Sequence, residues 1–219
     1  MPEIRFIAYS DYLCPWCYNA SLRLERLVRA FGGRVEVDYR SFLLRPHPAE
    51  KRDLERFRAY ARSWMRPGSE EDGGSFQLWE TDEPPPSHSV PAHQVAKAAA
   101  LLGAEPFERM HRRLLRAYFT ENRNISSPRR LRELWEELEL PPDGFERYRD
   151  PEILERILAE HSEAIECGAS GVPAVRLEGV EAVVTGAQPY EIYQRWAERA
   201  LERAASANTS DAASAREDG

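Results

Sequence analysis

The sequence lacks any apolar run close to the roughly 18–20 residues that a membrane-spanning helix needs. It therefore argues against a membrane protein. Mean hydropathy is −0.62 and 31% of the residues are charged, which indicates a strongly polar surface. The hydrophobic residues still make up 42% of the 219 positions. This composition suits one domain, or one domain with a large insertion, around a real core.

Cysteine and lysine are both scarce. The few cysteines argue against a disulfide-rich secreted protein, and the charge balance argues against a nucleic-acid-binding protein. Three cysteines are too few for a disulfide framework, and the segment 2–9 is too short and too charged for the apolar core of a secretory signal. We therefore expect a cytoplasmic protein. Lys51 and Lys97 are the only lysines, and the formal net charge is −7, which argues against a basic face for nucleic acid.

The pattern of apolar residues predicts two halves of a small mixed sheet with a long helical block between them. Alternating apolar residues at both ends of the chain predict strands, and helical spacing fills the middle. The expected strands are 3–9, 34–41, 174–177 and 182–185, and the expected helices are 15–31, 49–65, 91–103, 106–120, 128–139, 151–167 and 189–204.

This order predicts an α/β protein with four segments. A strand, a helix and a strand within about 40 residues form a βαβ unit, which implies a parallel strand pair and a right-handed crossover. The expected segments are 1–45 for this first half, 46–165 for the all-helical insertion, 166–205 for the ββα second half, and 206–219 for a small, polar tail that we expect to be disordered.

The most informative motif is Cys14-Pro15-Trp16-Cys17, at the junction of the first strand and the first helix. Backbone N–H groups and the helix dipole at such a junction stabilise a thiolate, which is the attacking form of cysteine. Cys17 lies one helical turn later, within disulfide reach. The spacing predicts that Cys14 attacks a disulfide and that Cys17 resolves the mixed disulfide.

A Cys-x-x-Cys motif is also half of many zinc sites, but those usually have a second ligand pair at similar spacing. The only other cysteine is Cys167, which we expect to be a buried small apolar residue, with a regulatory role as the alternative. His88 and His93 are the one histidine pair with suitable spacing. Redox chemistry is the favoured interpretation, with no metal and no bound organic cofactor.

A second motif, Gly171-Val172-Pro173, precedes the third strand. A proline at this place can take the cis form found in tight structural sites. In a βαβ–ββα arrangement it would face Cys14, and the backbone of Val172 could pair with an extended substrate segment. Alone, the motif is equally consistent with an ordinary turn.

Together these residues resemble the thioredoxin-fold superfamily and, within it, the FrnE-like cytoplasmic branch of the DsbA family. The resemblance covers about residues 3–200. It is carried by the segments 10–18 (Ser-Asp-Tyr-Leu-Cys-Pro-Trp-Cys-Tyr), 40–44 (Arg-Ser-Phe-Leu-Leu), 92–93 (Ala-His), 118–119 (Tyr-Phe), 124–126 (Asn-Ile-Ser), 171–173 (Gly-Val-Pro) and 184–188 (Val-Thr-Gly-Ala-Gln).

The resemblance implies a thioredoxin fold with a helical insertion over the active site. It implies a thiol–disulfide oxidoreductase in which Cys14 is the nucleophile, Cys17 is the resolving thiol and Pro173 is cis. The expected substrates are protein disulfides or dithiols and small thiols, with glutathione among the candidates.

The expected substrate-contacting residues are Pro15, Trp16, Val172, Pro173 and His93. Two of them have an alternative role, because Trp16 could pack against the insertion and His93 could be a structural histidine.

The proton acceptor for Cys17 is left unassigned. The buried acid usual in thioredoxins would stand at Ala8. Asp11 could take part in proton transfer, but a loop aspartate more often bonds nearby backbone N–H groups.

Two other functions remain open at this point. The same fold occurs in 2-hydroxychromene-2-carboxylate isomerases and kappa-class glutathione transferases, which typically carry serine where Cys14 stands and bind glutathione. A non-catalytic binding domain or a zinc-holding domain is the second alternative. The oligomeric state, the natural substrate and the direction of electron flow are not determined by the sequence.

Overall fold

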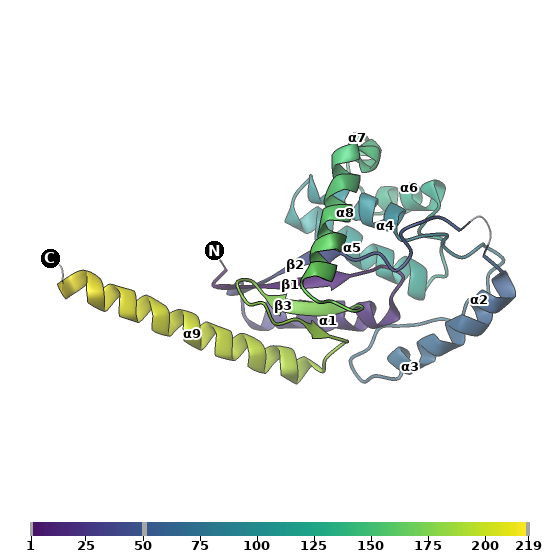
Figure 1. Ribbon diagram of the computed structural model, residues 1–219. Coiled ribbons are helices and arrows are strands. Elements are labelled where there is room, and N and C mark those ends of the chain that lie inside the picture. The colour runs from purple at the N-terminus through teal and green to yellow at the C-terminus, as the bar shows by residue number, and fades with distance from the viewer. Residues whose placement is uncertain (1, 50–51, 218–219) are drawn as a thin grey trace.

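The computed structural model of this protein describes residues 2–49 and 52–217 (Figure 1). A four-stranded mixed sheet lies at its centre, in the order β2-β1-β3-β4. The strands are β1 (Ile4–Ser10), β2 (Val35–Ser41), β3 (Ala174–Leu177) and β4 (Val184–Thr185). Strand β1 pairs in parallel with β2 and antiparallel with β3, and β3 pairs antiparallel with β4. The predicted thioredoxin fold, βαβ followed by ββα with helices inserted between, is confirmed.

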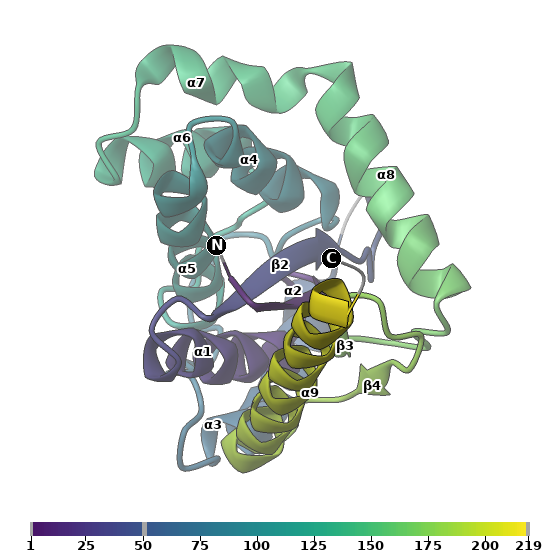
Figure 2. The same cartoon turned by 90° about the vertical axis from the view of Figure 1, so that its left-hand side faces the viewer.

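One face of the sheet is covered by the helices α1 (Pro15–Ala30) and α9 (Tyr190–Glu217), which pack against each other (Figures 1 and 2). Phe6 from the sheet, Leu24 and Leu27 from α1 and Tyr193 from α9 meet in a fully buried cluster. Helix α1 ends where Gly32 and Gly33 take φ values of +55° and +84°, a left-handed conformation that favours glycine.

The chain between β2 and β3 forms the inserted helices; the last of them packs on β2 over the other face of the sheet, whereas the second lies beside α1 (Figures 1 and 2). They are α2 (Leu54–Ala61), α3 (Met65–Gly68), α4 (Val90–Ala100), α5 (Ala104–Phe119), α6 (Pro128–Glu137), α7 (Pro142–Glu146) and α8 (Pro151–Glu166), with 3₁₀ turns at Arg62–Trp64 and Arg147–Arg149. Their core is aromatic, with Trp64, Trp79, Tyr118 and Phe119 in mutual edge and tilted ring contacts. The insertion therefore has its own apolar core beside that of the sheet.

Three segments differ from the sequence-based expectations. Helix α2 begins at Leu54 rather than at residue 49, because the Asp53 side chain accepts a hydrogen bond from the Arg56 N–H and so starts the helix. The short helix α7 was not expected. Helix α9 continues to Glu217, where we expected a disordered tail over 206–219, since no glycine or proline interrupts this alanine-rich segment before Gly219. Residues 218–219 lie outside the described residues.

None of the helices in the described part of the chain is both long and apolar enough to cross a membrane.

A buried ion pair joins the insertion to the sheet edge. Lys97 on α4 donates to Glu160 on α8 over 2.7 Å and to the backbone oxygen of Tyr39 on β2 over 3.1 Å. The second carboxylate oxygen of Glu160 accepts from the Ser41 N–H at 2.7 Å. The side chains of Lys97 and Glu160 are only 5% and 9% exposed, and Lys97 is the buried one of the two cations that contact Glu160.

We expect Lys97→Met to lower the free energy of unfolding by about 3 kcal/mol, because it leaves a buried carboxylate short of a partner. Arg156→Met is the matched control. Arg156 also contacts Glu160 but its side chain is 55% exposed, so its loss should cost less than about 1 kcal/mol. Urea denaturation of the three proteins measures both effects. Equal costs for the two substitutions would contradict the assigned role of Lys97.

Candidate active site

Cys14 and Cys17 lie together at the first turn of α1. Cys14 is the N-cap residue, and its Sγ accepts a hydrogen bond from the Cys17 N–H at 3.3 Å. Pro15 at the first helical position suits this start, since its missing N–H is not needed there. The two side chains are 5% and 1% exposed, and both are free thiols. The sulfur of Cys14 therefore lies at the N-terminal end of α1, in contact with a backbone N–H group.

The Gly171–Pro173 segment meets Cys14 from the opposite side. The Cys14 thiol donates to the backbone oxygen of Val172 over 3.4 Å, and the Val172–Pro173 peptide bond is cis. Pro173 is buried, and its backbone oxygen accepts from the Gly186 N–H at 2.7 Å. Two segments about 160 positions apart in the sequence thus form one side of the thiol site.

The environment distinguishes the two cysteines. Burial raises the pKa of Cys17 well above its usual value, and the neighbouring Cys14 sulfur raises it further. The Ser10 side chain and the Asp11 backbone act in the opposite direction but do not offset the burial. Burial therefore favours the protonated thiol of Cys17.

Pro15 and Trp16 lie between the cysteines and are both partly exposed. The guanidinium of Arg66 lies 5.9 Å from the centre of the Trp16 ring, within cation–π range. Trp16 is thus open to a ligand beside the thiols, while one side of its ring faces a basic group.

His93 does not lie in the thiol site. Its ring is 4% exposed and packs edge-on against Tyr12, with ring centres 4.9 Å apart. Burial, with Lys97 nearby, lowers the pKa of His93 to about 3, and Nε2 has no hydrogen-bond partner. Helix α4 carries this position into the interior, as the structural alternative expects, and contact with a substrate stays a prediction.

Asp11 joins three segments beneath the cysteines. One carboxylate oxygen accepts from the Leu13 N–H at 2.7 Å, as expected of a loop aspartate. The other accepts from the Leu44 N–H and from the Ser89 hydroxyl, both at 2.6 Å. The backbone oxygen of Asp11 also accepts from the Cys14 N–H at 3.1 Å. The contacts to Leu44 and Ser89 could not be anticipated, since they come from remote parts of the chain.

Asp11 is fully buried without a contacting cation. Burial raises its pKa to about 6, although hydrogen bonds from Ser89, Leu13 and Leu44 favour the charged form. Desolvation of the carboxylate therefore raises the pKa of Asp11 by more than the three hydrogen-bond donors lower it.

Cys167 is partly exposed, and not buried as predicted. It ends α8 beside Gly168, whose φ of +88° turns the chain outward. The Tyr9 hydroxyl donates to its sulfur over 3.8 Å.

Within the described residues, no group of three or more His, Cys, Asp or Glu side chains is arranged to hold a metal ion.

The raised pKa of Asp11 predicts a defined pH dependence of stability. A carboxyl with a folded pKa near 6 and an unfolded pKa near 4 stabilises the folded state at low pH, and that contribution is lost as pH rises through this window. Between about pH 4 and pH 6, the free energy of unfolding of the wild type should fall by up to about 3 kcal/mol relative to that of Asp11→Asn. Urea denaturation at several pH values measures the difference, and a flat difference would contradict the assignment.

Comparisons with solved structures support this fold. A structure described as a probable DsbA oxidoreductase from Streptomyces coelicolor is 25% identical, with a TM-score of 0.72 over 91% of this chain and 90% of that one. The cytosolic disulfide reductase DsbM from Pseudomonas aeruginosa is 21% identical, with a TM-score of 0.72 over 90% of this chain and 98% of that one. DsbM has also been solved with GSH.

A 2-hydroxychromene-2-carboxylate isomerase shares the fold as well, at 18% identity and a TM-score of 0.65 over 92% of this chain and 98% of that one. Among curated proteins, none matches this chain significantly. The family model described as the DSBA-like thioredoxin domain matches residues 5–196, which is nearly the whole chain. This protein therefore belongs to the family of DSBA-like thioredoxin domains.

Proposed function

We propose that this protein is a thiol–disulfide oxidoreductase that uses Cys14 and Cys17 as its redox pair. The observation that carries the proposal is the asymmetry between the two thiols. The Cys14 sulfur accepts a backbone N–H at the start of α1, whereas the pKa of Cys17 is raised by burial. One thiol is thus suited to attack, and the other is held in reserve to resolve the intermediate.

The exchange balances atoms and electrons without a further cofactor. The Cys14 thiolate attacks one sulfur of a substrate disulfide, so that a Cys14–substrate disulfide forms and the first substrate thiolate leaves. Cys17 then loses its proton to that leaving thiolate and attacks the Cys14 sulfur, so that the Cys14–substrate bond breaks and the second substrate sulfur leaves as a thiolate. The substrate has gained two electrons, and Cys14 and Cys17 form a disulfide. The reverse sequence oxidises a substrate dithiol.

The proposed substrates are protein disulfides or dithiols and small thiols. The backbone of Val172, next to Cys14, offers a polar group to an extended substrate chain, and Trp16 offers a partly exposed ring. The similarity to DsbM, which has been solved with GSH, supports glutathione as one candidate. A cytoplasmic location is part of the same proposal, because DsbM is described as cytosolic.

A glutathione-dependent isomerase or transferase is the second candidate, and the likeness to the 2-hydroxychromene-2-carboxylate isomerase favours it. Such an activity would not require the second thiol, so retention of all activity in Cys17→Ser would select it. A binding domain without catalysis would tolerate the loss of either cysteine.

The exchange mechanism predicts opposite outcomes for the two cysteine variants. Reduced Cys17→Ser should accumulate a stable mixed disulfide with oxidised glutathione, since nothing resolves it, while Cys14→Ser should form none at position 17. Mass spectrometry after acid quenching measures both. Cys167→Ser is the control and should exchange within about twofold of wild type. Mixed disulfide at Cys17 in the absence of Cys14 would overturn the assignment of the nucleophile.

A further inference from the structure

Strand β2 lies at the edge of the sheet, and part of its backbone has no hydrogen-bond partner. In the parallel pairing with β1, successive residues alternate, so that the backbone groups of Glu36 and Asp38 face β1. Those of Val35, Val37 and Tyr39 therefore face outward. Within the described residues, the outward N–H and C=O groups of Val35 and Val37 form no hydrogen bond.

Two side chains show the outward direction and occupy one end of this edge. Lys97 donates to the outward C=O of Tyr39 over 3.1 Å, and Glu160 accepts from the outward N–H of Ser41 at 2.7 Å. The free groups therefore lie in the earlier part of the strand, toward Val35. An edge strand with unpaired backbone groups is a template for pairing with another extended chain.

A groove of about 610 Å³ runs along this free edge, and we call it the β2 groove. It is lined by Val35, Val37 and Tyr39 of the strand, by Val28 near the end of α1 and by Phe107 near the start of α5. Its volume lies within the range of roughly 300–1,000 Å³ that ligand-binding clefts occupy. The free backbone groups of β2 therefore face a space that a ligand can enter.

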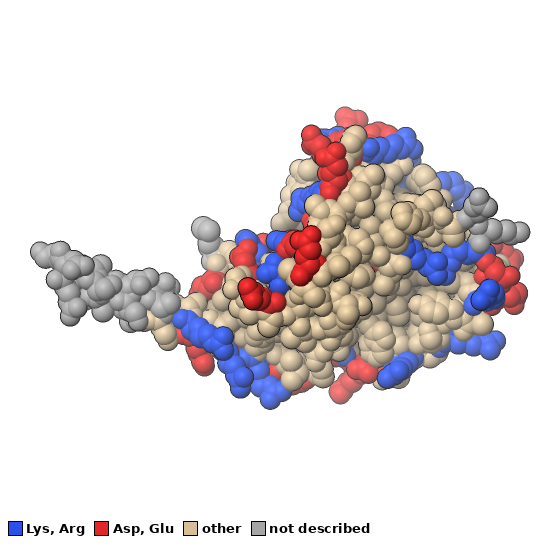
Figure 3. Space-filling view, in the orientation of Figure 1, with Lys and Arg blue, Asp and Glu red and all other residues tan. Residues whose placement is uncertain are grey.

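The charged side chains around the β2 groove already have partners. Every acidic and basic residue that lines it forms an ion pair, as Glu25 does with Arg29 and with Arg112. Acidic and basic side chains are also interspersed on the face that Figure 3 shows. The groups that lack a partner in the β2 groove are thus backbone groups. They favour the backbone of an extended chain as the ligand over a charged group.

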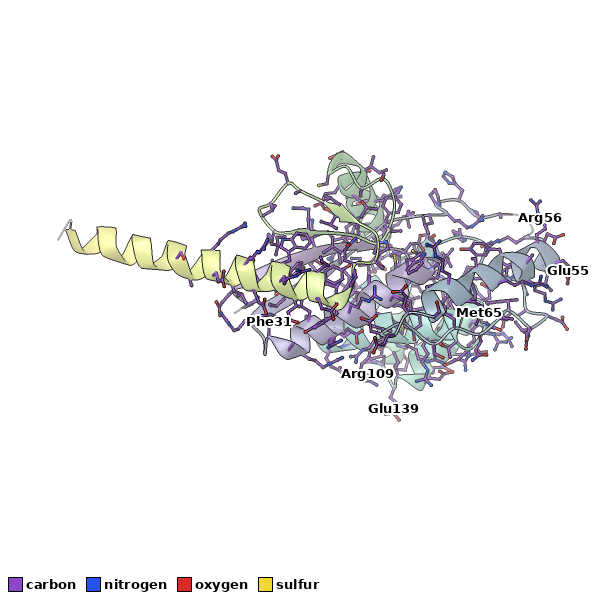
Figure 4. The ribbon with its side chains drawn as sticks, turned by 90° about the horizontal axis from the view of Figure 1, so that it is seen from below. Phe31, Glu55, Arg56, Met65, Arg109 and Glu139 are labelled. Atoms are coloured by element: carbon purple, nitrogen blue, oxygen red, sulfur yellow. The ribbon has the colours of Figure 1, made fainter. Side chains whose placement is uncertain are left out.

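The β2 groove is separate from the thiol site. No residue of the segments 14–17 and 171–173 lines it. Strand β2 begins close to Phe31, which follows the end of α1. Figure 4 shows Phe31 well apart from Met65, and the guanidinium that contacts Trp16 belongs to the residue after Met65. A ligand in the β2 groove therefore leaves the thiols free.

We propose that the free edge of β2 binds an extended, uncharged segment of a partner protein, which adds a strand to the sheet. The segment would bond through its backbone to Val35, Val37 and Tyr39 and pack its side chains against Val28 and Phe107. A second copy of this chain does not fit, because its own β2 edge is recessed between the same helices, which would collide first. The inference goes beyond thiol exchange and does not depend on it.

Amide hydrogen exchange of the protein alone tests whether the edge is free. The Val37 N–H should exchange at least about tenfold faster than those of Glu36 and Asp38, because β1 protects only the latter two. Exchange followed by NMR measures all three amides in one sample. Equal protection of the three would mean that the edge is not free and would overturn the proposal.

An extended peptide tests binding. The probe is acetyl-Thr-Val-Thr-Val-Thr-amide, which is uncharged and strongly prefers the strand conformation. NMR titration should give saturable shifts of the Val37 and Tyr39 amides, with a dissociation constant below about 1 mM. The same peptide N-methylated at every residue has no N–H donors and should give none. Absence of saturable shifts, equal shifts with both peptides, or shifts confined to Trp16 at the thiol site would overturn the proposal.

A pair of variants on α5 tests the location. Ala104 lines the β2 groove at the first turn of α5, so Ala104→Leu should fill part of it and weaken binding of the peptide at least about tenfold. Glu105→Leu is the matched control, because it adds the same side chain one position later, outside the lining. It should bind within about twofold of wild type. Undiminished binding by Ala104→Leu, or an equal loss in both variants, would overturn the proposal.

Discussion

The hydrogen bonds of the buried Asp11 carboxylate are the contacts on which the geometry of the thiol site depends. They join the loop before Cys14, the turn after β2 and the start of α4, so the βαβ half and the insertion meet at one side chain. Burying a carboxylate without a contacting cation is unfavourable, and the pKa of Asp11 is raised even though the Arg45 charge nearby lowers it. A stable core on both sides of the sheet offsets that cost and keeps the Cys14 loop in one conformation.

The layout of the fold could be predicted because its signals are local. Alternating apolar residues mark β1 and β2, and Gly32 and Gly33 mark the end of α1. Helix α7 was missed because five residues among prolines carry little periodicity. The end of α9 was misjudged because small polar residues are typical both of disorder and, when alanine is frequent, of helix.

The thiol site could be predicted only where one short motif contains the chemistry. Cys14 and Cys17 are three positions apart, so their chemistry follows from the helix start that contains them. The supporting residues come from elsewhere: Ser89 begins α4 and Leu44 follows β2. Their roles arise from hydrogen bonds between remote segments, which one sequence does not reveal. The burial of His93 could not be predicted for the same reason, because the direction of its side chain depends on how α4 packs.

If Cys14 and Cys17 exchange two electrons as a pair, a redox titration should show it. The protein would be equilibrated in buffers of varied reduced and oxidised glutathione, quenched with acid, and its thiols counted by mass spectrometry. We expect one two-electron transition from two thiols to a Cys14–Cys17 disulfide, with Cys167 unchanged. If no such disulfide formed at any ratio, or glutathione remained attached to Cys14 instead, the claim would be contradicted.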